Sequence, residues 1–309
     1  MKVAIFGATG FVGTYILNEL LSKGYTPRIL VRAQSLEKVS KREKIEIVTG
    51  NIEDRSAILE TIQHCNALIY LIGIIREFPG QNITFEKLHY DGVLYCIEAA
   101  KKCGIQHFVL MSANGVKENG TPYQHTKWKA EQALIQSGLE YTIFRPSLIF
   151  GDPKGQGRPE FCTQIRDDML SLPLPAPLFY TGLLPFNAGQ FELTPIHVKN
   201  VAQFFINALN KNETKGKTFE LGGESHFTWE EILKFIALAS GKKTWQMPTP
   251  VLVVHTIAAF FDRYPWFPVT RGQLTMLLEG NIVEKHFFKS FDIKPIPFME
   301  KELKYLKSV

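Results

Sequence analysis

Short apolar runs alternate with amphipathic segments through the first half of the chain. The apolar runs have the length of buried strands and lie near residues 2–6, 27–31, 45–49, 67–72, 106–112 and 140–145. Between them, apolar side chains recur at helical spacing near residues 11–23, 54–64, 83–103 and 121–137. This alternation predicts βαβ units, and therefore a doubly wound α/β fold in which helices cover both faces of a parallel sheet.

The pattern changes after about residue 150. Residues 151–190 are rich in glycine and proline, and residues 169–191 carry no charged side chain, which is compatible with a substrate lid, a docking surface or irregular packing. A helix near 198–210, a strand near 217–221 and helices near 228–240, 249–262 and 270–279 follow. We therefore predict a sheet domain over residues 1–150, to which residues 190–222 return. A smaller, mostly helical lobe over residues 151–309 borders the ligand crevice at the carboxyl ends of the strands.

Composition narrows the class of protein. The 309-residue chain has 45% apolar and 21% charged residues, and its net charge of +5 is not concentrated in a basic run, which argues against nucleic-acid binding. The cysteines form no CxxC pair, so neither a metal site nor a disulfide framework is predicted: Cys65, Cys96, Cys103 and Cys162. Met1 stands practically in the first strand, and the apolar stretches 67–75 and 251–261 are too short to span a bilayer. We expect a cytoplasmic protein without a membrane span; peripheral association with the inner face of a membrane stays open.

The first strand is followed at once by a glycine-rich turn and a helix. Gly7, Gly10 and Gly13 have the spacing GxxGxxG, in the strand–turn–helix context that dinucleotide binding requires. Gly7 permits the tight turn, Gly10 lets backbone N–H groups approach a pyrophosphate, and Gly13 lets the helix pack close to the strand. The positive end of the helix then faces the phosphates. We predict a Rossmann fold that binds a nicotinamide dinucleotide through Gly7, Thr9, Gly10, Phe11, Val12 and Gly13.

The ends of the next strands predict the rest of the cofactor site. Where NAD-preferring proteins usually carry an acidic residue, the second strand ends in Val31 and Arg32, with Lys38 beyond. A guanidinium can pair with a 2′-phosphate and stack on adenine, so NADP(H) is favoured over NAD(H); a solvated surface arginine is the alternative. Lys41, Arg42 and Lys44 are expected to form a solvated face. After the third and fourth strands, further cofactor contacts are predicted for Asn51, Ile52, Leu71, Ile72 and Gly73.

The segment from Tyr123 to Lys127 (YQHTK) places a tyrosine and a lysine one turn apart on the helix that follows the fifth strand. The ammonium of Lys127 is expected to favour the phenolate of Tyr123, which makes it an acid or base at neutral pH, and the lysine can also hold the nicotinamide ribose. Ser112, at the end of the fifth strand, can hydrogen-bond a substrate carbonyl. These three residues are predicted to be catalytic in a hydride transfer whose proton the phenol relays, whereas His125 is expected to face solvent.

Three later segments add to these motifs: residues 145–151 (RPSLIFG), 195–202 (PIHVKNVA) and 218–223 (TFELGG). With them the chain resembles the short-chain dehydrogenase/reductase superfamily, in its extended or atypical branch of epimerase- and dehydratase-like proteins. The resemblance implies that Pro146 and Ser147 border the nicotinamide and that His197 tethers a loop. Asn200 stands where an aspartate is common, and the loop from Ser112 to Tyr123 is shorter than in the sugar-nucleotide enzymes.

The C-terminal third carries a narrower resemblance. Residues 267–274 (FPVTRGQL) and 277–283 (LLEGNIV) resemble the complex I NDUFA-nine-like group, which is related to an NADPH-holding accessory subunit of respiratory complex I. Three functions are therefore compatible with the sequence. The first is an NADP(H)-dependent oxidoreductase that acts on an unknown carbonyl or hydroxyl substrate, and the second is a non-catalytic structural, assembly or sensor protein that holds NADPH. The third, a sugar-nucleotide epimerase or dehydratase, is disfavoured by the short loop. The apolar segment 250–266 is expected to be a core helix of the lobe; a helix against a membrane or a respiratory partner is the alternative.

Overall fold

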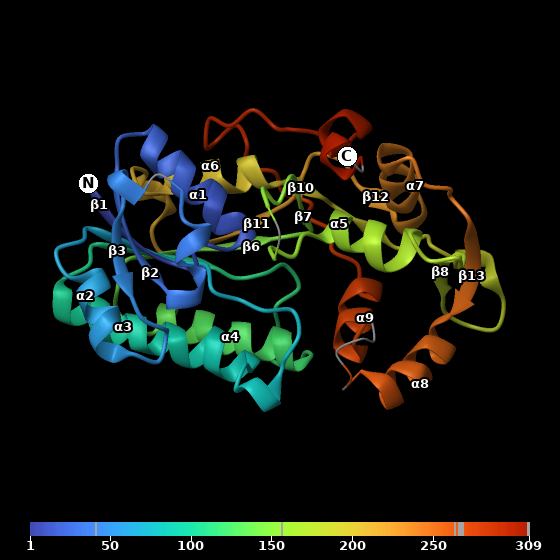
Figure 1. The fold of residues 1–309 in the computed structure, drawn as a ribbon, viewed down its shortest axis with the longest axis horizontal. Coiled ribbons are helices and arrows are strands. Elements are labelled where there is room, and N and C mark those ends of the chain that lie inside the picture. Colours follow the sequence, from blue (N-terminus) through green and yellow to red (C-terminus); the bar gives the residue numbers. More distant parts are fainter. Residues whose placement is uncertain (41, 156, 263, 265–268, 308–309) are drawn as a thin grey trace. The chain divides into compact units, whose positions relative to one another are not determined.

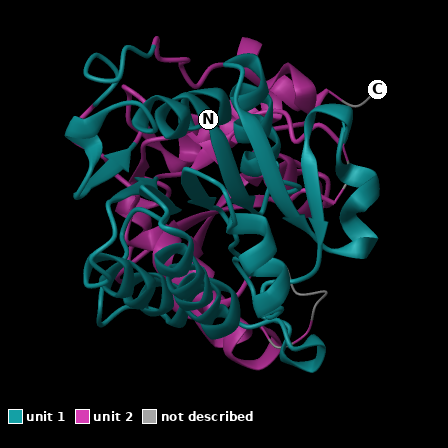
Figure 2. Cartoon of the chain, turned by 90° about the vertical axis from the view of Figure 1, so that its left-hand side faces the viewer, with its two compact units in different colours: residues 1–146, 198–221, 287–293 teal, residues 147–197, 222–286, 294–309 magenta. Residues whose placement is uncertain are grey.

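The computed structural model describes residues 1–40, 42–155, 157–262, 264 and 269–307 (Figure 1). The chain divides into two compact units, coloured separately in Figure 2. Unit 1 comprises residues 1–146, 198–221 and 287–293, and unit 2 comprises residues 147–197, 222–286 and 294–309. The chain thus returns to unit 1 twice, and the return at 287–293 was not predicted from the sequence.

Unit 1 is built on one parallel sheet. Within the described residues the sheet has seven strands, in the order β11-β6-β5-β4-β1-β2-β3, and every neighbouring pair is parallel. The strands are β1 (Lys2–Phe6), β2 (Thr26–Val31), β3 (Glu46–Thr49), β4 (Ala67–Tyr70), β5 (His107–Met111), β6 (Tyr141–Pro146) and β11 (Lys217–Leu221). The predicted Rossmann fold is confirmed, because the order 3-2-1-4-5-6 is that of a doubly wound dinucleotide-binding sheet.

Helices cover both faces of this sheet (Figure 1). They are α1 (Phe11–Ser22), α2 (Arg55–Ile62), α3 (Gly92–Cys103), α4 (Pro122–Ile135) and α6 (Val198–Ala208). Helices α1 and α6 pack together, as do α2, α3 and α4. Asp54 begins α2 by accepting hydrogen bonds from the N–H groups of Ser56 and Ala57, and Thr121 begins α4 with a capping box completed by Gln124.

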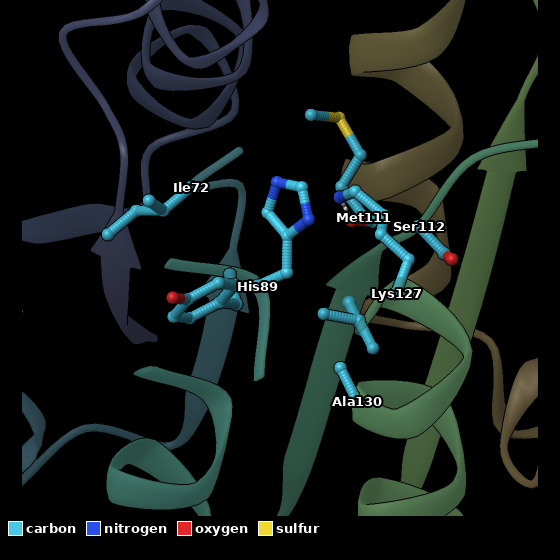
Figure 3. A pocket seen from close by; sticks show the side chains of 8 residues that line it. Ile72, His89, Met111, Ser112, Lys127 and Ala130 are labelled. Carbon is cyan, nitrogen blue, oxygen red and sulfur yellow. Dashed lines mark hydrogen bonds between the residues drawn. The ribbon is translucent and has the colours of Figure 1, made fainter. Parts of the chain in front are cut away.

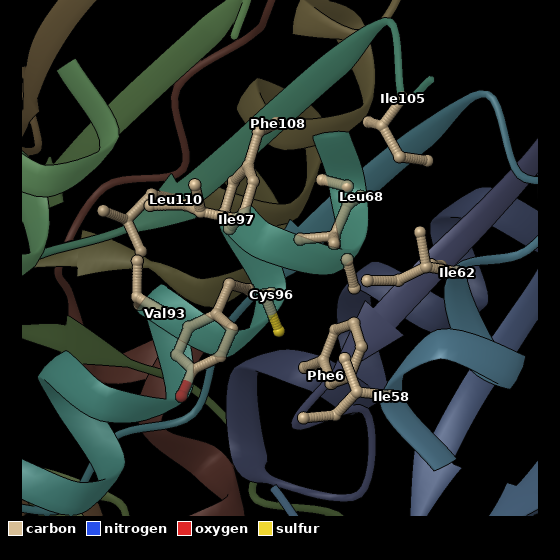
Figure 4. Packing of buried hydrophobic residues seen from close by; sticks show 14 of the residues in the cluster. Phe6, Ile58, Ile62, Leu68, Val93, Cys96, Ile97, Ile105, Phe108 and Leu110 are labelled. Carbon is tan, nitrogen blue, oxygen red and sulfur yellow. The ribbon is translucent and has the colours of Figure 1, made fainter. Parts of the chain in front are cut away.

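The face of the sheet under α2 and α3 buries a continuous apolar core. Phe6, Leu68 and Phe108 from three adjacent strands meet Ile58 of α2 and Cys96 of α3, all fully buried (Figure 4). Burial at this density is the main stabilising contribution to the unit, at about 1.5–3 kcal/mol for each large apolar side chain. The carboxyl ends of the strands, which carry the predicted site residues, are therefore held by a rigid platform.

The helix predicted over residues 83–103 has an irregular beginning. Residues Glu86–Asp91 form a π-helical turn, and the regular helix α3 starts only at Gly92. A Cβ at residue 92 would lie 2.2 Å from the Tyr70 hydroxyl oxygen, so only glycine lets α3 approach β4 this closely. Such π-helical turns are frequent at functional sites, and His89 in this turn lines the pocket described below.

Unit 2 combines short strand pairs with helices. Its strands are β7 (Ile149–Phe150), β8 (Ala176–Tyr180), β9 (Glu192–Leu193), β10 (Ile196–His197), β12 (Phe227–Thr228) and β13 (Gln246–Pro250), paired as β7–β10, β8–β13 and β9–β12. Its helices are α5 (Phe161–Ile165), α7 (Trp229–Ser240), α8 (Val251–Phe261) and α9 (Arg271–Leu278), and a 3-10 helix spans Glu300–Leu306. The core centres on Trp229, whose indole N–H donates to the Pro177 carbonyl at 2.9 Å. The strand pairs were not predicted, because β7, β9, β10 and β12 have two residues each and the five-residue strands β8 and β13 contain proline, which argues against a strand.

The prediction that residues 250–266 form a core helix was wrong. Helix α8 buries only Ala258 completely, whereas Leu252 is 78% and Phe260 68% exposed; Trp266 lies outside the described residues. The segment is apolar on all sides, so its periodicity could not indicate which face would be covered. In the part of the chain that the structure describes, no helix combines the length and apolar character needed to traverse a bilayer.

Candidate functional site

The glycine turn between β1 and α1 has the geometry that its spacing predicts. Gly7 has a φ of +92°, a conformation that glycine adopts without strain. A Cβ at residue 13 would lie 2.1 Å from the Gly7 carbonyl oxygen, so Gly13 is required for the close approach of α1 to the turn. The side chains of Phe11 and Val12 are buried. What they can offer a ligand is therefore their backbone N–H groups.

The N-terminus of α1 is suited to an anion. Among the described residues Gly10, its N-cap, contributes no side-chain hydrogen bond to the first turn, and that turn contains no acidic residue. Helices α2, α4, α7 and α9 all carry side-chain N-caps. Gly10 is exposed, and Thr9 beside it is half-buried. Free N–H groups at a positive helix end, reached over a residue without a side chain, fit a pyrophosphate.

The end of β2 presents a cation and no acid. Val31 is buried and Arg32 is exposed, and the Arg32 carbonyl accepts from the Ser35 N–H at 2.8 Å as the chain turns into a 3-10 helix over Ala33–Lys38. Lys38 is half-buried at the end of that helix. Arg42 and Lys44 are exposed, as predicted for a solvated face, and Lys41 lies outside the described residues.

The residues after β3 and β4 differ in what they leave available. Asn51 uses its Oδ1 to accept from the N–H groups of Glu53 and Asp54, at 2.7 and 3.2 Å, so only its amide N–H₂ can face a nucleotide. Ile52 packs its side chain into the core and offers only its backbone. After the end of β4, Leu71 is buried, Ile72 is half-buried and lines the pocket described below, and Gly73 is exposed. A Cβ at residue 73 would come 3.4 Å from Lys127 Nζ, an ordinary contact, so the backbone at Gly73 passes close to the lysine.

A small pocket opens where β4 and β5 end and α4 passes (Figure 3). It holds about 190 Å³ of space outside the atoms, part of it open to solvent, and is lined by Tyr70, Ile72, His89, Leu110, Met111, Ser112, Lys127 and Ala130. Ser112 is 4% exposed, and its hydroxyl has no hydrogen-bond partner among the described residues. Since a buried hydroxyl normally has a partner, this one fits a ligand oxygen.

Lys127 and Tyr123 face this region from successive turns of α4. The Lys127 Nζ donates to the Met111 carbonyl at 3.0 Å and lies 5.9 Å from the centre of the Tyr123 ring. Burial lowers the pKa of Lys127 to about 8, against a smaller opposite effect of Glu131. Burial also raises the pKa of Tyr123 to about 12. The expectation that Tyr123 has a lowered pKa was therefore wrong, because the loss of solvent outweighs the effect of an ammonium held at the Met111 carbonyl.

His89 belongs to this site and was not identified in the sequence. It lies in the π-helical turn, is 2% exposed, and packs edge-on against the Tyr123 ring with the centroids 5.2 Å apart. The sequence does contain one indication that His89 is buried: it lies four residues before Val93, on the apolar stripe of the predicted helix. A histidine at such a position is predicted to be buried, but its contacts depend on elements distant in sequence.

The residues singled out by resemblance have local roles. Pro146 ends β6, and its carbonyl accepts from the Asn114 N–H at 3.0 Å. In unit 2, Ser147 is buried and donates to the Thr194 carbonyl. His197, also in unit 2, is buried with its ring edge-on to Phe150.

Two further polar residues can be placed in unit 1. Asn200 is fully buried and donates to the Gln203 side chain at 3.0 Å. His125 is half-buried: it contacts the Glu118 carbonyl through Nδ1 at 2.6 Å and stacks on Trp128. His125 was expected to face solvent, and these contacts correct that expectation, although it does not line the pocket.

The sheet order and the glycine turn define the class of protein: a Rossmann-fold protein with the geometry of a dinucleotide-binding domain. The chain matches the NAD(P)H-binding family over residues 7–165, just over half of its length, and belongs to that family. A solved structure with the same fold is the UDP-glucose 4-epimerase of Thermus thermophilus in complex with NAD, with a TM-score of 0.73, 18% identity, and 99% of this chain and 97% of that chain covered.

Curated relatives of different roles are similar along most of the chain. The mitochondrial 40 kDa subunit of NADH-ubiquinone oxidoreductase from Neurospora crassa is 26% identical, covering 98% of this chain and 78% of that protein. The photosystem II assembly factor Ycf39 of Trieres chinensis is 26% identical, with 95% and 86% covered. The ceramide reductase of Caulobacter vibrioides is also 26% identical, with 85% and 78% covered. The chain is thus an NAD(P)H-binding protein related to a subunit of NADH-ubiquinone oxidoreductase, to a photosystem II assembly factor and to a reductase.

Proposed function

We propose that this chain is an NADP(H)-dependent oxidoreductase that interconverts a carbonyl group and the corresponding hydroxyl. The observation that carries the proposal is the buried Ser112 hydroxyl without a partner among the described residues, in a pocket that it shares with Lys127. An unpaired buried hydroxyl costs about 1–3 kcal/mol, and a substrate oxygen would remove that cost. Tyr123 lies next to the same pocket through its contact with His89.

The pKa values support the following roles for the side chains. A bound nicotinamide would supply the hydride for the carbonyl carbon, or accept it in the reverse direction. Tyr123, with a pKa of about 12, keeps its proton at neutral pH and donates it to the substrate oxygen. Ser112 orients that oxygen by a hydrogen bond. Lys127, charged at neutral pH with a pKa of about 8, stabilises the phenolate that forms and holds the ribose, and solvent returns the proton to Tyr123.

The proposed cofactor contacts follow the strand ends of unit 1. The backbone N–H groups of the first turn of α1 would hold the pyrophosphate. Arg32, assisted by Lys38, would bind the 2′-phosphate of NADP(H). The absence of an acidic side chain at the end of β2, within the described part of the chain, supports NADP(H) over NAD(H). The remaining proposed contacts in unit 1 are Asn51 and Ile52 on the adenosine side, and Leu71, Ile72, Gly73 and Pro146 on the nicotinamide side.

A second candidate is a protein that holds NADPH without turnover and docks on a membrane-bound complex. The specific observation is that large apolar side chains of unit 2 are exposed: Leu183, Phe186, Leu252 and Phe260 are 98%, 87%, 78% and 68% exposed. Exposed apolar side chains are covered when a partner binds to them. Two of the relatives are named as a respiratory-complex subunit and a photosystem assembly factor, whereas a third is named as a reductase.

One experiment separates these functions. The purified protein is first tested for a copurifying nucleotide and then titrated with NADPH and NADH, followed by a panel of ketones and aldehydes with NADPH consumption as the readout. Preferential NADPH binding with turnover supports the oxidoreductase. Tightly retained NADPH without turnover of any substrate supports the structural candidate, and absence of binding to either nucleotide contradicts both.

A further inference from the structure

His89 connects two parts of unit 1 that both face the pocket (Figure 3). The Ile74 N–H, just after the end of β4, donates to His89 Nε2 at 3.1 Å. On the other side of the ring, Nδ1 lies 3.1 Å from the Thr126 hydroxyl oxygen on α4. The ring therefore bridges the backbone that follows Gly73 and the helix that carries Tyr123 and Lys127.

The partners of His89 determine where its proton lies. A backbone N–H can only donate, so Nε2 is the acceptor and the proton sits on Nδ1. Nδ1 then donates to the Thr126 hydroxyl oxygen, whose own proton is directed at the carbonyls of Pro122 and Tyr123, at 2.9 and 3.1 Å. Every donor and acceptor of the neutral ring is used within the protein. A protonated ring would point an N–H at the Ile74 N–H.

The ring also limits the position of Tyr123. His89 is edge-on to Tyr123 and stacked on Phe85, with both centroid distances 5.2 Å, and Phe85 itself is edge-on to Tyr123 at 5.7 Å. The three rings form a closed triangle, and such contacts contribute about 0.5–1.5 kcal/mol each beyond their burial. Any rotation of His89 would therefore move Tyr123 as well as the 72–74 backbone.

We propose that His89 is the positioning residue of this site. As a neutral imidazole with its proton on Nδ1, it fixes the distance between the backbone at Ile72–Ile74 and the side of α4 that carries Tyr123 and Lys127. The nicotinamide half of the cofactor is held between these two parts. This rests on the proposed function, since it presupposes a dinucleotide. It predicts a selective effect. Loss of the bridge weakens contacts with the nicotinamide half and leaves the glycine turn and Arg32, which hold the adenosine half, unchanged.

The test compares two ligands on the full chain. NADPH carries both halves of the dinucleotide, whereas 2′,5′-ADP carries only the adenosine half with its 2′-phosphate. In His89→Phe, which keeps the ring contacts and removes both hydrogen bonds, we expect about tenfold weaker NADPH binding and unchanged 2′,5′-ADP binding. His89→Asn, which can again accept at one atom and donate at another, is expected to recover part of the loss.

Two further variants guard against a general folding defect. Thr126→Val removes only the acceptor for Nδ1 and conserves volume, so it is expected to reproduce the selective loss more weakly. His125→Phe alters a histidine on the same helix outside the pocket and is expected to bind both ligands as the wild type does. Equal losses of both ligands in His89→Phe and Thr126→Val, or no loss in either variant, would overturn the positioning role. If the wild type binds neither ligand, the proposed function itself fails.

Discussion

Lys127 and Tyr123 share one side of α4, with the lysine Nζ 5.9 Å from the centre of the phenol ring and hydrogen-bonded to the Met111 carbonyl at 3.0 Å. The ammonium is close enough to stabilise a phenolate once it forms, but burial keeps the resting phenol protonated, with a pKa of about 12. The pair is therefore arranged as an acid beside a cation. In the proposed oxidoreductase, this arrangement would favour the direction in which a carbonyl is reduced, because the resting phenol has a proton to donate.

Tyr123→Phe tests whether Tyr123 donates the proton to the substrate oxygen. We expect NADPH affinity to change less than about threefold, because the removed hydroxyl is not a proposed cofactor contact, and turnover of any identified carbonyl substrate to fall by about 10²–10⁴-fold. Tyr95→Phe, which alters a ring on α3 that packs against Arg55 of α2, is the control and keeps full activity. Full activity in the Tyr123 variant would remove this residue from the mechanism.

Lys127→Met is expected to stabilise the fold while abolishing turnover. Holding a buried ammonium with a pKa of about 8, against 10.5 for an ordinary lysine, costs roughly 3 kcal/mol at neutral pH. The variant avoids this cost but leaves the Met111 carbonyl without a donor, which destabilises it by about 1–2 kcal/mol. We therefore expect its free energy of unfolding to be higher than that of the wild type by roughly 1–2 kcal/mol.

The pH dependence of that gain has a definite sign. Between about pH 8 and 10.5 the unfolded wild type binds more protons at this lysine than the folded state does, so wild-type stability rises with pH and the advantage of Lys127→Met shrinks. Urea unfolding at pH 7 and pH 10 measures it. Lys129→Met, which removes a lysine paired with Glu86 on the surface of α4, is the control. A Lys127 variant less stable than the wild type at pH 7 contradicts the burial argument.

Arg32→Ala tests the cofactor preference. A guanidinium paired with a 2′-phosphate contributes about 1.5–3 kcal/mol, so we expect NADPH binding to weaken by roughly 10–100-fold and NADH binding to change by less than about twofold. Fluorescence titration measures both. Arg55→Ala, which removes an exposed arginine paired with Glu98, is the matched control. Equal losses for the two nucleotides would exclude a 2′-phosphate role for Arg32.

Gly10→Ala and Gly13→Ala distinguish the contribution of the glycine turn to dinucleotide binding from its contribution to stability. A Cβ at residue 10 meets its nearest protein atom at 3.4 Å, an ordinary contact, so the first variant keeps its stability within about 1 kcal/mol. It is expected to lose dinucleotide binding, because the Cβ covers the approach to the helix N-terminus. At residue 13 the Cβ would lie 2.1 Å from the Gly7 oxygen, so the second variant loses both binding and roughly 3 kcal/mol or more of stability. Unimpaired binding in Gly10→Ala would place the pyrophosphate elsewhere.

Two buried histidines are expected to make the free energy of unfolding decrease at acid pH. Burial lowers the pKa of His107 to about 4 and, with the nearby Lys127 ammonium, that of His89 to about 2, against 6.5 for an ordinary histidine. Below pH 6.5 the unfolded chain therefore takes up protons that the folded protein cannot bind. Stability is full above pH 6.5 and falls with decreasing pH towards 4, by up to about 1.4 kcal/mol per pH unit for each histidine.

Urea unfolding between pH 7 and pH 5 measures this loss. In His107→Phe the decrease with pH should be shallower by the contribution of one proton. If the wild type and the variant share one pH profile, His107 is not the responsible group.

Local patterns were sufficient for most of the fold. The strand β1, the glycine turn and α1 were predicted almost to the residue, because strand and helix periodicities and the steric needs of Gly7 and Gly13 are properties of neighbouring residues. The order of elements then left a doubly wound sheet as the expected topology, since parallel strands joined by helices have one favoured handedness. The positions of Ser112, Tyr123 and Lys127 at the carboxyl ends of the strands follow from that topology.

What the sequence could not determine depends on contacts between distant segments. Periodicity indicates that a face is apolar, but not what covers it, so the exposure of Phe260 on α8 and the return of residues 287–293 to unit 1 emerged only from the structure. The same holds for His89, whose partners Ile74 and Thr126 lie on different elements. The proton affinity of Tyr123 was decided by burial, which outweighs the neighbouring charge that the sequence did reveal. Sequence therefore determined which chemical groups this protein has and where along the fold they occur, whereas tertiary packing determined their exposure, their partners and their charge.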